Sequence, residues 1–181
     1  MTLTRFRSRN HPQQVTEVGA RPDVDDRGTP PEVFDPLHER FQFTLDVAAS
    51  HHNAKLERYL TVGDDGLTTS WAGHRVWCNP PYSDIDTWVR KAWVEWGTGA
   101  ELIVMLLPAN RTEQLWWQAH VEPHRDRPDS PLRVEFLAGR LRFLIGGQGT
   151  VPTLFGGQGT AYIPDQQPPF GCCLLIWEPE A

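Results

Sequence analysis

The 181-residue sequence is poor in cysteine and contains no long apolar run. Its three cysteines, Cys78, Cys172 and Cys173, are too few for the disulfide framework of a small secreted protein, and none of their spacings is typical of a zinc site. The longest unbroken apolar run, at 102–107, is far shorter than the ~20 residues needed to cross a membrane. Residues 4–10 are charged, with no apolar stretch behind them, so we expect no secretory signal and a cytoplasmic location.

The sequence also lacks a basic excess, because its formal net charge is −6 at pH 7. Nucleic-acid-binding proteins usually carry clustered positive charge, so a DNA-binding surface on this chain must be local. Of the 17 basic residues, 15 are arginine, which binds phosphate and guanine through paired hydrogen bonds better than lysine does. Five arginines gather late in the chain, at Arg125, Arg127, Arg133, Arg140 and Arg142. They form either such a local surface or ordinary solvated faces, and the sequence leaves both interpretations open.

The length and composition fit one globular domain with a sizeable core. Residues 1–26 are polar, with acidic side chains at Asp23, Asp25 and Asp26, and we expect them to form a mobile N-terminal arm. The domain itself is then expected to span 27–181.

Strand-like and helix-like segments alternate along this domain, which predicts an α/β sheet. A helix should begin after Thr29, with Thr29 as its cap and Pro30 and Pro31 in its first turn. Ligands of α/β sheets bind beyond the carboxyl ends of the strands, where Asp46 and Asn79 both fall. Strands are expected over 43–47, 59–62, 76–78, 102–107, 134–136, 141–145 and 172–177, and further helices over 85–96 and 113–121.

The most informative motif is Asn79-Pro80-Pro81-Tyr82, directly after the strand-like run 75–78. The two prolines stiffen the loop and remove two backbone donors, which leaves carbonyl groups to accept hydrogen bonds from a ligand. Asn79 adds a side-chain acceptor and Tyr82 adds a flat aromatic face. This combination suits a planar group that bears an amino group, because it offers two acceptors for the two N–H bonds and a ring for stacking.

The motif resembles the catalytic loop of S-adenosylmethionine-dependent amino-methyltransferases, which methylate adenine N6, cytosine N4 or a protein glutamine amide. A longer series of segments, in the same order, resembles the phage-type DNA N-6-adenine methyltransferase (Dam-like) family. The matching segments are Thr29-Pro30, 43–49, 53–55, 65–67, Trp71, 78–83 and 88–92, with weaker likeness at 138–143 and 169–171.

This resemblance implies a single-domain, Rossmann-like S-adenosylmethionine-dependent methyltransferase sheet. It implies that the chain transfers a methyl group from S-adenosylmethionine to a flipped-out adenine in DNA, and that it is encoded by a phage or prophage and acts in the bacterial cytoplasm. Residues 109–170 would include the loops that read the target. No metal is implied.

The resemblance also assigns residues to roles. Asn79 Oδ1 and the Pro80 carbonyl would accept the two N–H bonds of the target amine, with Pro81 stiffening the loop and Tyr82 stacking on the base. Ser83, Arg140 and Arg142 join Tyr82 as expected substrate-binding residues. The expected cofactor-binding residues are Thr29, Pro30, Asp46, Ala48, Asp64, Asp65 and Asn79.

Several alternatives remain open from sequence. The same fold can act on cytosine N4, on RNA or on a protein glutamine amide, and a catalytically silent binding module is a rival of another class. Cytosine C5 chemistry is disfavoured, because it needs a Pro-Cys pair that the chain lacks, and Cys78 is interpreted as core. Trp88 is interpreted as core or interface, and one of Trp116 and Trp117 is expected to face outward. The repeated Gly-Gly-Gln-Gly-Thr at 146–150 and 156–160 is either a plain hairpin or a contact for a DNA groove, and the oligomeric state, monomer or homodimer, is undecided.

Overall fold

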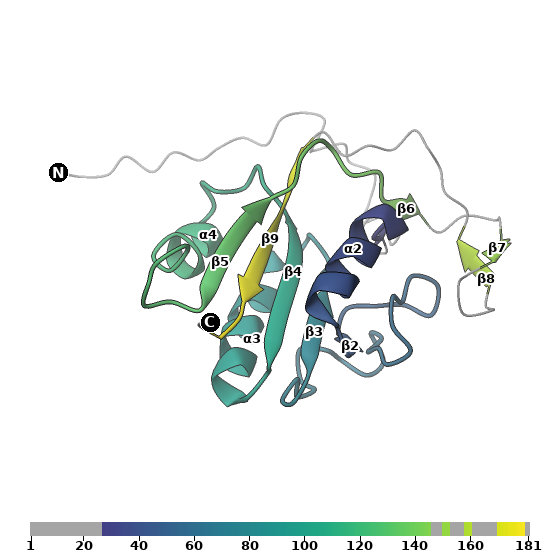
Figure 1. Ribbon diagram of the computed structural model, residues 1–181, viewed down its shortest axis with the longest axis horizontal. Coiled ribbons are helices and arrows are strands. Elements are labelled where there is room, and N and C mark those ends of the chain that lie inside the picture. The colour runs from purple at the N-terminus through teal and green to yellow at the C-terminus, as the bar shows by residue number, and fades with distance from the viewer. Residues whose placement is uncertain (1–26, 146–149, 153–157, 161–169, 180–181) are drawn as a thin grey trace.

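The computed structural model describes residues 27–145, 150–152, 158–160 and 170–179. Its centre is a five-stranded sheet in the order β2-β3-β4-β9-β5 (Figure 1). The parallel strands are β2 (Leu45–Asp46), β3 (Arg75–Cys78) and β4 (Leu102–Pro108). Strand β9 (Cys172–Trp177) runs antiparallel to both β4 and β5 (Leu132–Phe136). The carboxyl ends of β2, β3 and β4 therefore share one edge, as expected for a ligand-binding α/β sheet.

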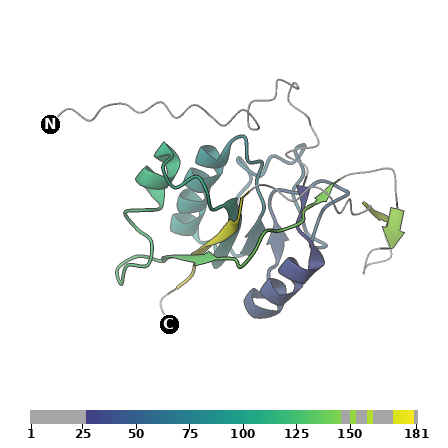
Figure 2. The ribbon, with the colours of Figure 1, turned by 90° about the horizontal axis from the view of Figure 1, so that it is seen from above.

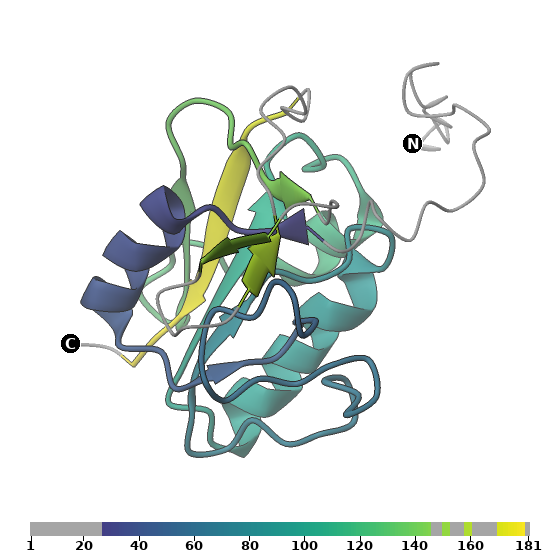
Figure 3. The same cartoon turned by 90° about the vertical axis from the view of Figure 1, so that its right-hand side faces the viewer.

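Helices cover both faces of this sheet (Figures 2 and 3). Helix α2 (Pro31–Phe41) packs on one face, and α3 (Ile85–Thr98) and α4 (Leu115–His120) pack on the other. Every residue of β4 and β9 is buried, and side chains along each strand alternate between the two cores. Continuous apolar runs of this kind are typical of strands covered on both faces.

Two short antiparallel pairs complete the described structure. Strand β1 (Arg27–Gly28) pairs with β6 (Leu144–Ile145), and β7 (Thr150–Pro152) pairs with β8 (Gln158–Thr160). Thr150 lies opposite Thr160, so the last residues of the two repeat copies pair with each other between β7 and β8. The remaining residues of the first copy, and the first two of the second, lie outside the described residues, as does the expected N-terminal arm at 1–26.

The structure confirms the α/β class, the three helices and the buried strands at 102–107 and 172–177. It shortens the first predicted strand to Leu45–Asp46, and that at 141–145 to Leu144–Ile145. The predicted strand at 59–62 is wrong, because only Tyr59 forms an isolated bridge with Asp46. The chain turns directly afterwards, since the Asp64 carboxylate accepts hydrogen bonds from both the backbone N–H and the hydroxyl of Thr61.

Two side-chain predictions are also wrong. Pro30, not Thr29, occupies the N-cap position of α2, and no side chain caps that helix. Trp116 and Trp117 are both buried, at 5% and 1% exposure. Their indole N–H groups donate to Gln114 and Glu122, so both rings enter the core without losing hydrogen bonds.

Among the described residues, no helix is long and apolar enough to span a membrane. The same part of the chain holds no cluster of three or more His, Cys, Asp or Glu side chains arranged for a metal ion.

Candidate active site

Asp46 ends β2 and is only 3% exposed, which is unusual for a carboxylate. Its Oδ2 accepts a hydrogen bond from the backbone N–H of Lys55 (3.0 Å), and its Oδ1 accepts one from that of Ala48 (3.4 Å). Burial raises the pKa of Asp46 to about 6, although these two hydrogen bonds and the Lys55 ammonium act in the opposite direction. The segment after β2 thus donates backbone hydrogen bonds to the buried Asp46 carboxylate, whose charged form a cationic ligand would stabilise.

Asn79 follows β3, the strand adjacent to β2, so it lies at the same edge of the sheet as Asp46. Its Nδ2 donates a hydrogen bond of 2.7 Å to the carbonyl of Arg27 in β1. This contact fixes the orientation of the amide, and among the described residues no donor reaches Oδ1. Pro80 is buried and Pro81 is partly exposed, which agrees with a stiff loop between the strand and α3.

Tyr82 is half-buried at the end of this loop. Its ring makes an edge contact with Phe143 (6.1 Å between centroids) and a tilted contact with Phe170 (6.2 Å). Burial raises the pKa of Tyr82 well above its usual value, and its hydroxyl lies close to the Cys172 thiol. The Tyr82 carbonyl accepts a hydrogen bond from Arg111 (2.8 Å), which ties the loop to the segment after β4.

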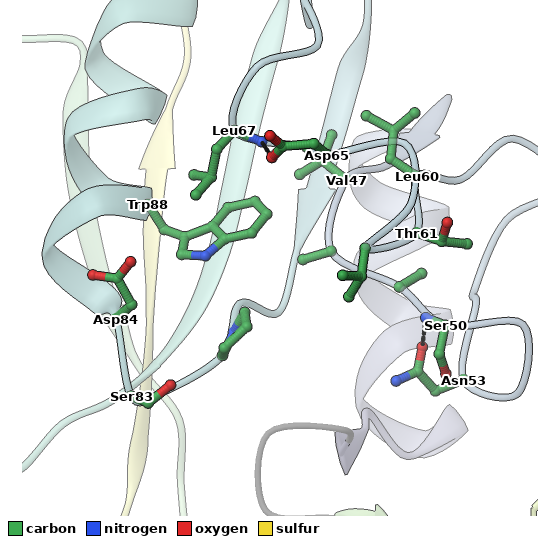
Figure 4. Close-up of a pocket in the computed structure, with 15 residues that line it drawn as sticks. Val47, Ser50, Asn53, Leu60, Thr61, Asp65, Leu67, Ser83, Asp84 and Trp88 are labelled. Carbon is green, nitrogen blue, oxygen red and sulfur yellow. Dashed lines mark hydrogen bonds between the residues drawn. The ribbon is translucent and has the colours of Figure 1, made fainter. Parts of the chain in front are cut away.

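A cavity of about 640 Å³ opens beside these residues (Figure 4). Three segments form its walls: the loop after β2, the turn at 60–67 and the start of α3 with the loop before it. Trp88 of α3 presents its indole ring along one side, facing the 47–53 and 60–61 segments across the space. The cavity is lined by Val47, Ala48, Ala49, Ser50, Asn53, Leu60, Thr61, Val62, Asp65, Gly66, Leu67, Pro81, Ser83, Asp84 and Trp88.

Gly66 sets the position of one wall of this cavity. A Cβ at this residue would lie 2.2 Å from the Val47 carbonyl oxygen and 3.0 Å from the Trp88 ring, so the backbone approaches as only glycine permits. Asp65 precedes it with φ of 50°, and its Oδ1 accepts a hydrogen bond from Leu67 N–H (3.1 Å). The wall is therefore a tight turn pressed against the end of β2.

A smaller hollow adjoins the cavity, since Ala48 and Asn53 line both. It reaches Asp46 and Asn79 and is also lined by Arg27, Thr29 and Lys55. Thr29 is 1% exposed, and its buried hydroxyl has no hydrogen-bond partner among the described residues. A buried polar group without a partner is costly, so this hydroxyl marks a place where a ligand would contribute a hydrogen bond.

The structure brings most of the expected cofactor-binding residues together but not all of them. Thr29, Asp46, Ala48, Asp65 and Asn79 line the cavity or the hollow. Pro30 is buried at the start of α2. Asp64 lines neither space, because its carboxylate is turned toward Thr61, and the two hydrogen bonds from that residue lower the pKa of Asp64.

The expected substrate-binding residues divide in a similar way. Ser83 lines the cavity, whereas Arg140 and Arg142 are exposed and lie apart from it. Residues 140–143 alternate, with Arg140 and Arg142 exposed while Leu141 and Phe143 are buried, and Phe143 contacts Tyr82. The buried side chains of this stretch therefore pack beside the 79–82 loop, and its two arginines face solvent.

Sequence reasoning missed several residues of the site. It gave Asn53 and Lys55 no role, treated Trp88 as core or interface, and named Gly66 only as part of the matching segment 65–67. The pair Asp65-Gly66 is typical of a turn and can be read from the sequence. The close contact between Gly66 and Val47 cannot, because Val47 follows a distant strand.

Residues 19–153 match the sequence profile of the family described as DNA N-6-adenine-methyltransferase (Dam). This segment includes every residue that lines the cavity and the hollow. The chain belongs to the Dam family.

Two phage proteins illustrate the likeness within this family. The chain is 30% identical over 159 residues to a DNA N-6-adenine-methyltransferase of Escherichia phage T1, covering 80% of this chain and 61% of that protein. It is 36% identical over 87 residues to a DNA N-6-adenine-methyltransferase of Haemophilus phage HP1 (strain HP1c1), covering 47% of this chain and 50% of that protein. The chain thus spans between half and two thirds of the length of these relatives.

In this Dam-family chain, the shared edge of β2 and β3 can serve two chemical tasks at once. The Asp46 carboxylate can accept hydrogen bonds from a cationic group, and Asn79 Oδ1 can accept one from an amino group. The cavity beside them is large enough for a small organic ligand, and Trp88 offers an aromatic surface within it.

Proposed function

We propose that this chain is a DNA adenine-N6 methyltransferase that uses S-adenosylmethionine. The observation that carries the proposal is that the Asn79 amide, oriented by Arg27, and the buried Asp46 line the same hollow, which adjoins the cavity. The names of the phage relatives agree with this activity.

The residues present fit S-adenosylmethionine. Asp46 would receive the ammonium of the methionine part, and the unpartnered Thr29 hydroxyl offers a donor to its carboxylate. Trp88 and Leu60 offer apolar contact to the nucleoside part, and the Asp65 carboxylate lies within the same wall. When bound, S-adenosylmethionine supplies an electrophilic methyl group.

Asn79 and Pro80 would act on the target amine. The lone pair of an exocyclic adenine amine is delocalised into the ring, so the nitrogen is a weak nucleophile. Hydrogen bonds from its two N–H groups to Asn79 Oδ1 and the Pro80 carbonyl favour the tetrahedral nitrogen that forms in the transition state. No covalent intermediate is needed, and the stiff loop supplies the alignment.

Tyr82 would stack on the adenine after the base leaves the duplex, because a base cannot be reached inside the helix. Phe143 and Phe170 hold the Tyr82 ring through their edge and tilted contacts. Ser83 lies next to it on the cavity side of the loop.

Arg140 and Arg142 would contact the DNA backbone. They have no ion-pair partners among the described residues, whereas Arg125, Arg127 and Arg133 each pair with nearby carboxylates. Unpaired arginines beside the catalytic loop are suited to phosphate binding, which positions the duplex without reading its sequence. A local surface of this kind reconciles DNA binding with a net charge of −6.

We further propose that the sheet is Rossmann-like. Parallel β2, β3 and β4 with helices on both faces, and a ligand site beyond their carboxyl ends, support this assignment.

The test is to incubate the full chain with methyl-labelled S-adenosylmethionine and unmethylated DNA and to identify the modified nucleoside by mass spectrometry. We expect labelled N6-methyl-2′-deoxyadenosine. N4-methylcytosine would keep the mechanism and change the base. Absence of any methylated nucleoside, with the cofactor still bound in calorimetry, would overturn DNA as the acceptor and direct attention to RNA, to a protein glutamine or to a binding role.

A further inference from the structure

A buried carboxylate lies in α3, away from the residues that contact the proposed ligands. Glu95 is 4% exposed and falls on the apolar side of the helix. Its Oε2 accepts a hydrogen bond from the backbone N–H of Trp71 (2.6 Å) and a longer one from the Ser70 hydroxyl (3.4 Å). Its Oε1 pairs with the Lys91 ammonium at 2.6 Å.

This arrangement keeps Glu95 charged inside the protein. Burial by itself would raise its pKa, but the hydrogen bonds from Lys91 and Trp71 outweigh that effect, so the pKa of Glu95 is lowered. A buried ion pair contributes little net stability compared with well-packed apolar side chains. We therefore ask which neighbouring groups the Glu95 carboxylate holds in place.

Trp71 connects Glu95 to the cavity wall. Trp71 is fully buried, and its indole Nε1 donates a hydrogen bond of 2.9 Å to the carbonyl of Gly66. Its ring stacks near that of Trp88 (6.3 Å between centroids, 23° between planes). Gly66 and Trp88 both line the cavity of about 640 Å³.

The wall at Gly66 leaves little freedom for displacement. The turn already lies so close to the Val47 carbonyl that no Cβ fits at Gly66. The indole N–H of Trp71 donates a hydrogen bond to the Gly66 carbonyl of this turn, and the backbone N–H of Trp71 donates one to the Glu95 carboxylate. A chain of two hydrogen bonds therefore runs from α3 to the wall that faces the loop after β2.

We propose that Glu95 is a positioning residue for cofactor binding, acting through Trp71 to fix the cavity wall at Gly66. This rests on the proposed function, in which the nucleoside part of S-adenosylmethionine occupies that cavity. Glu95 touches neither ligand nor catalytic loop, so its loss should affect affinity for the cofactor and not the chemical step. The sequence carries a signal for this role, because an acidic residue interrupts the apolar stripe of α3 four positions after Lys91.

Two variants break the chain of hydrogen bonds at different links. Glu95→Gln keeps the side-chain shape but replaces one acceptor oxygen by an NH2 donor that must face Lys91 or Trp71. Trp71→Phe keeps an aromatic ring and removes the N–H that reaches Gly66. Each should weaken S-adenosylmethionine binding about three- to ten-fold, the effect of one ordinary hydrogen bond. The loss of affinity in the double variant should be smaller than the product of the two single losses, because both substitutions break the same chain of hydrogen bonds.

Asp86→Asn is the matched control. Asp86 forms an ion pair with Arg90 at the same i, i+4 spacing on the same helix, but it is more exposed and lines neither space. Its replacement should leave cofactor affinity unchanged.

The experiment measures S-adenosylmethionine binding by calorimetry, together with KM and kcat for methyl transfer and the thermal unfolding midpoint. The inference predicts a raised Kd and KM with kcat nearly unchanged at saturating cofactor. Lower thermal stability with unchanged Kd and KM would overturn it and leave Glu95 a purely structural residue. If Glu95→Gln does not fold, Trp71→Phe decides the question. Failure of the unaltered chain to bind S-adenosylmethionine would instead contradict the proposed function.

Discussion

The centre of the sheet and the edge at the carboxyl ends of β2 and β3 are built in opposite ways. All side chains of β4 and β9 are buried, and each strand pairs along most of its length with neighbours on both sides. Strand β2 has only two residues, and the buried polar groups Asp46 and Thr29 lie at or near its end. The centre is specified by apolar area, whereas the edge is specified by single hydrogen bonds and close backbone contacts.

This difference separates stability from function in space. Burying a large aliphatic side chain contributes about 1.5–3 kcal/mol, so the central strands supply much of the folding free energy. A buried carboxylate such as Asp46 opposes folding unless a cation reaches it. Changes at the centre should therefore reduce stability alone. Changes to the polar side chains at the edge should reduce function with little or no loss of stability, whereas a substitution that strains a close backbone contact there should reduce both.

The largest effect on stability is expected at the centre, for Leu106→Ala. Leu106 is fully buried in β4 opposite Leu174, on the face covered by α2. The cavity left behind should lower the free energy of unfolding by about 2–5 kcal/mol. Chemical denaturation measures this loss. The kcat of the folded variant should match that of the unaltered chain, and a large fall in kcat would break the proposed separation.

The complementary change is Asn79→Ala at the edge. Loss of the acceptor for the target amine should reduce methyl transfer by at least about 100-fold, as removal of one preorganised hydrogen bond does in other active sites. Cofactor binding by calorimetry should be nearly intact. Asn110→Ala provides a control, because Asn110 is exposed in the turn after β4 and lines neither the cavity nor the hollow. Transfer at the normal rate by Asn79→Ala would refute the mechanism.

Asp46→Asn should weaken cofactor binding about 10- to 100-fold, the effect of a hydrogen bond to a charged group. The same change should stabilise the free protein at neutral pH by about 1–3 kcal/mol, since it removes a buried charge. The pKa of Asp46 is raised to about 6, so folding favours its protonated form. The gain in unfolding free energy of Asp46→Asn over the unaltered chain should be absent below pH about 4, the pKa of aspartate in the unfolded chain. It should grow as the pH rises, until the pH reaches about 6. Unfolding free energies measured across this range check the sign, and a constant difference would contradict the assignment.

Two glycine substitutions should change stability in opposite directions, and the smallest effect is expected at Gly97. Gly66→Ala must displace the Val47 carbonyl or the Trp88 ring, so it should cost about 1–3 kcal/mol and weaken cofactor binding. Gly97→Ala, in an exposed position of α3 with open space around it, should instead stabilise the chain by about 0.5–1 kcal/mol. Thermal unfolding of both variants measures this contrast. Equal effects would mean that the wall at Gly66 is not a tight contact.

The sequence predicted the centre of the molecule well, because its signals are local. The apolar runs at 102–107 and 172–177 and the helical spacing of Ile85, Trp88 and Val89 are visible without knowledge of their partners. The joint position of Asp46 and Asn79 followed from the rule that parallel strands end at one edge. The structure confirms these elements and places Asp46 and Asn79 at one edge of the sheet.

The parts that could not be predicted depend on residues far apart in the chain. The wall at Gly66 is defined by Val47, and the hydrogen bond between Trp71 and Glu95 joins residues 24 positions apart. The interpretation of 59–62 as a strand failed because Asp64 turns the chain after one bridge. Alternating apolar residues do not reveal where pairing stops.

The most direct test of the account is a crystal structure of the full chain with S-adenosylhomocysteine, the demethylated product of the cofactor. The account predicts that its amino group contacts the Asp46 carboxylate and that its purine ring lies in the cavity beside Trp88. A ligand bound elsewhere, or a purine outside this cavity, would contradict the assignment of the edge between β2 and β3 as the place where cofactor and target base meet.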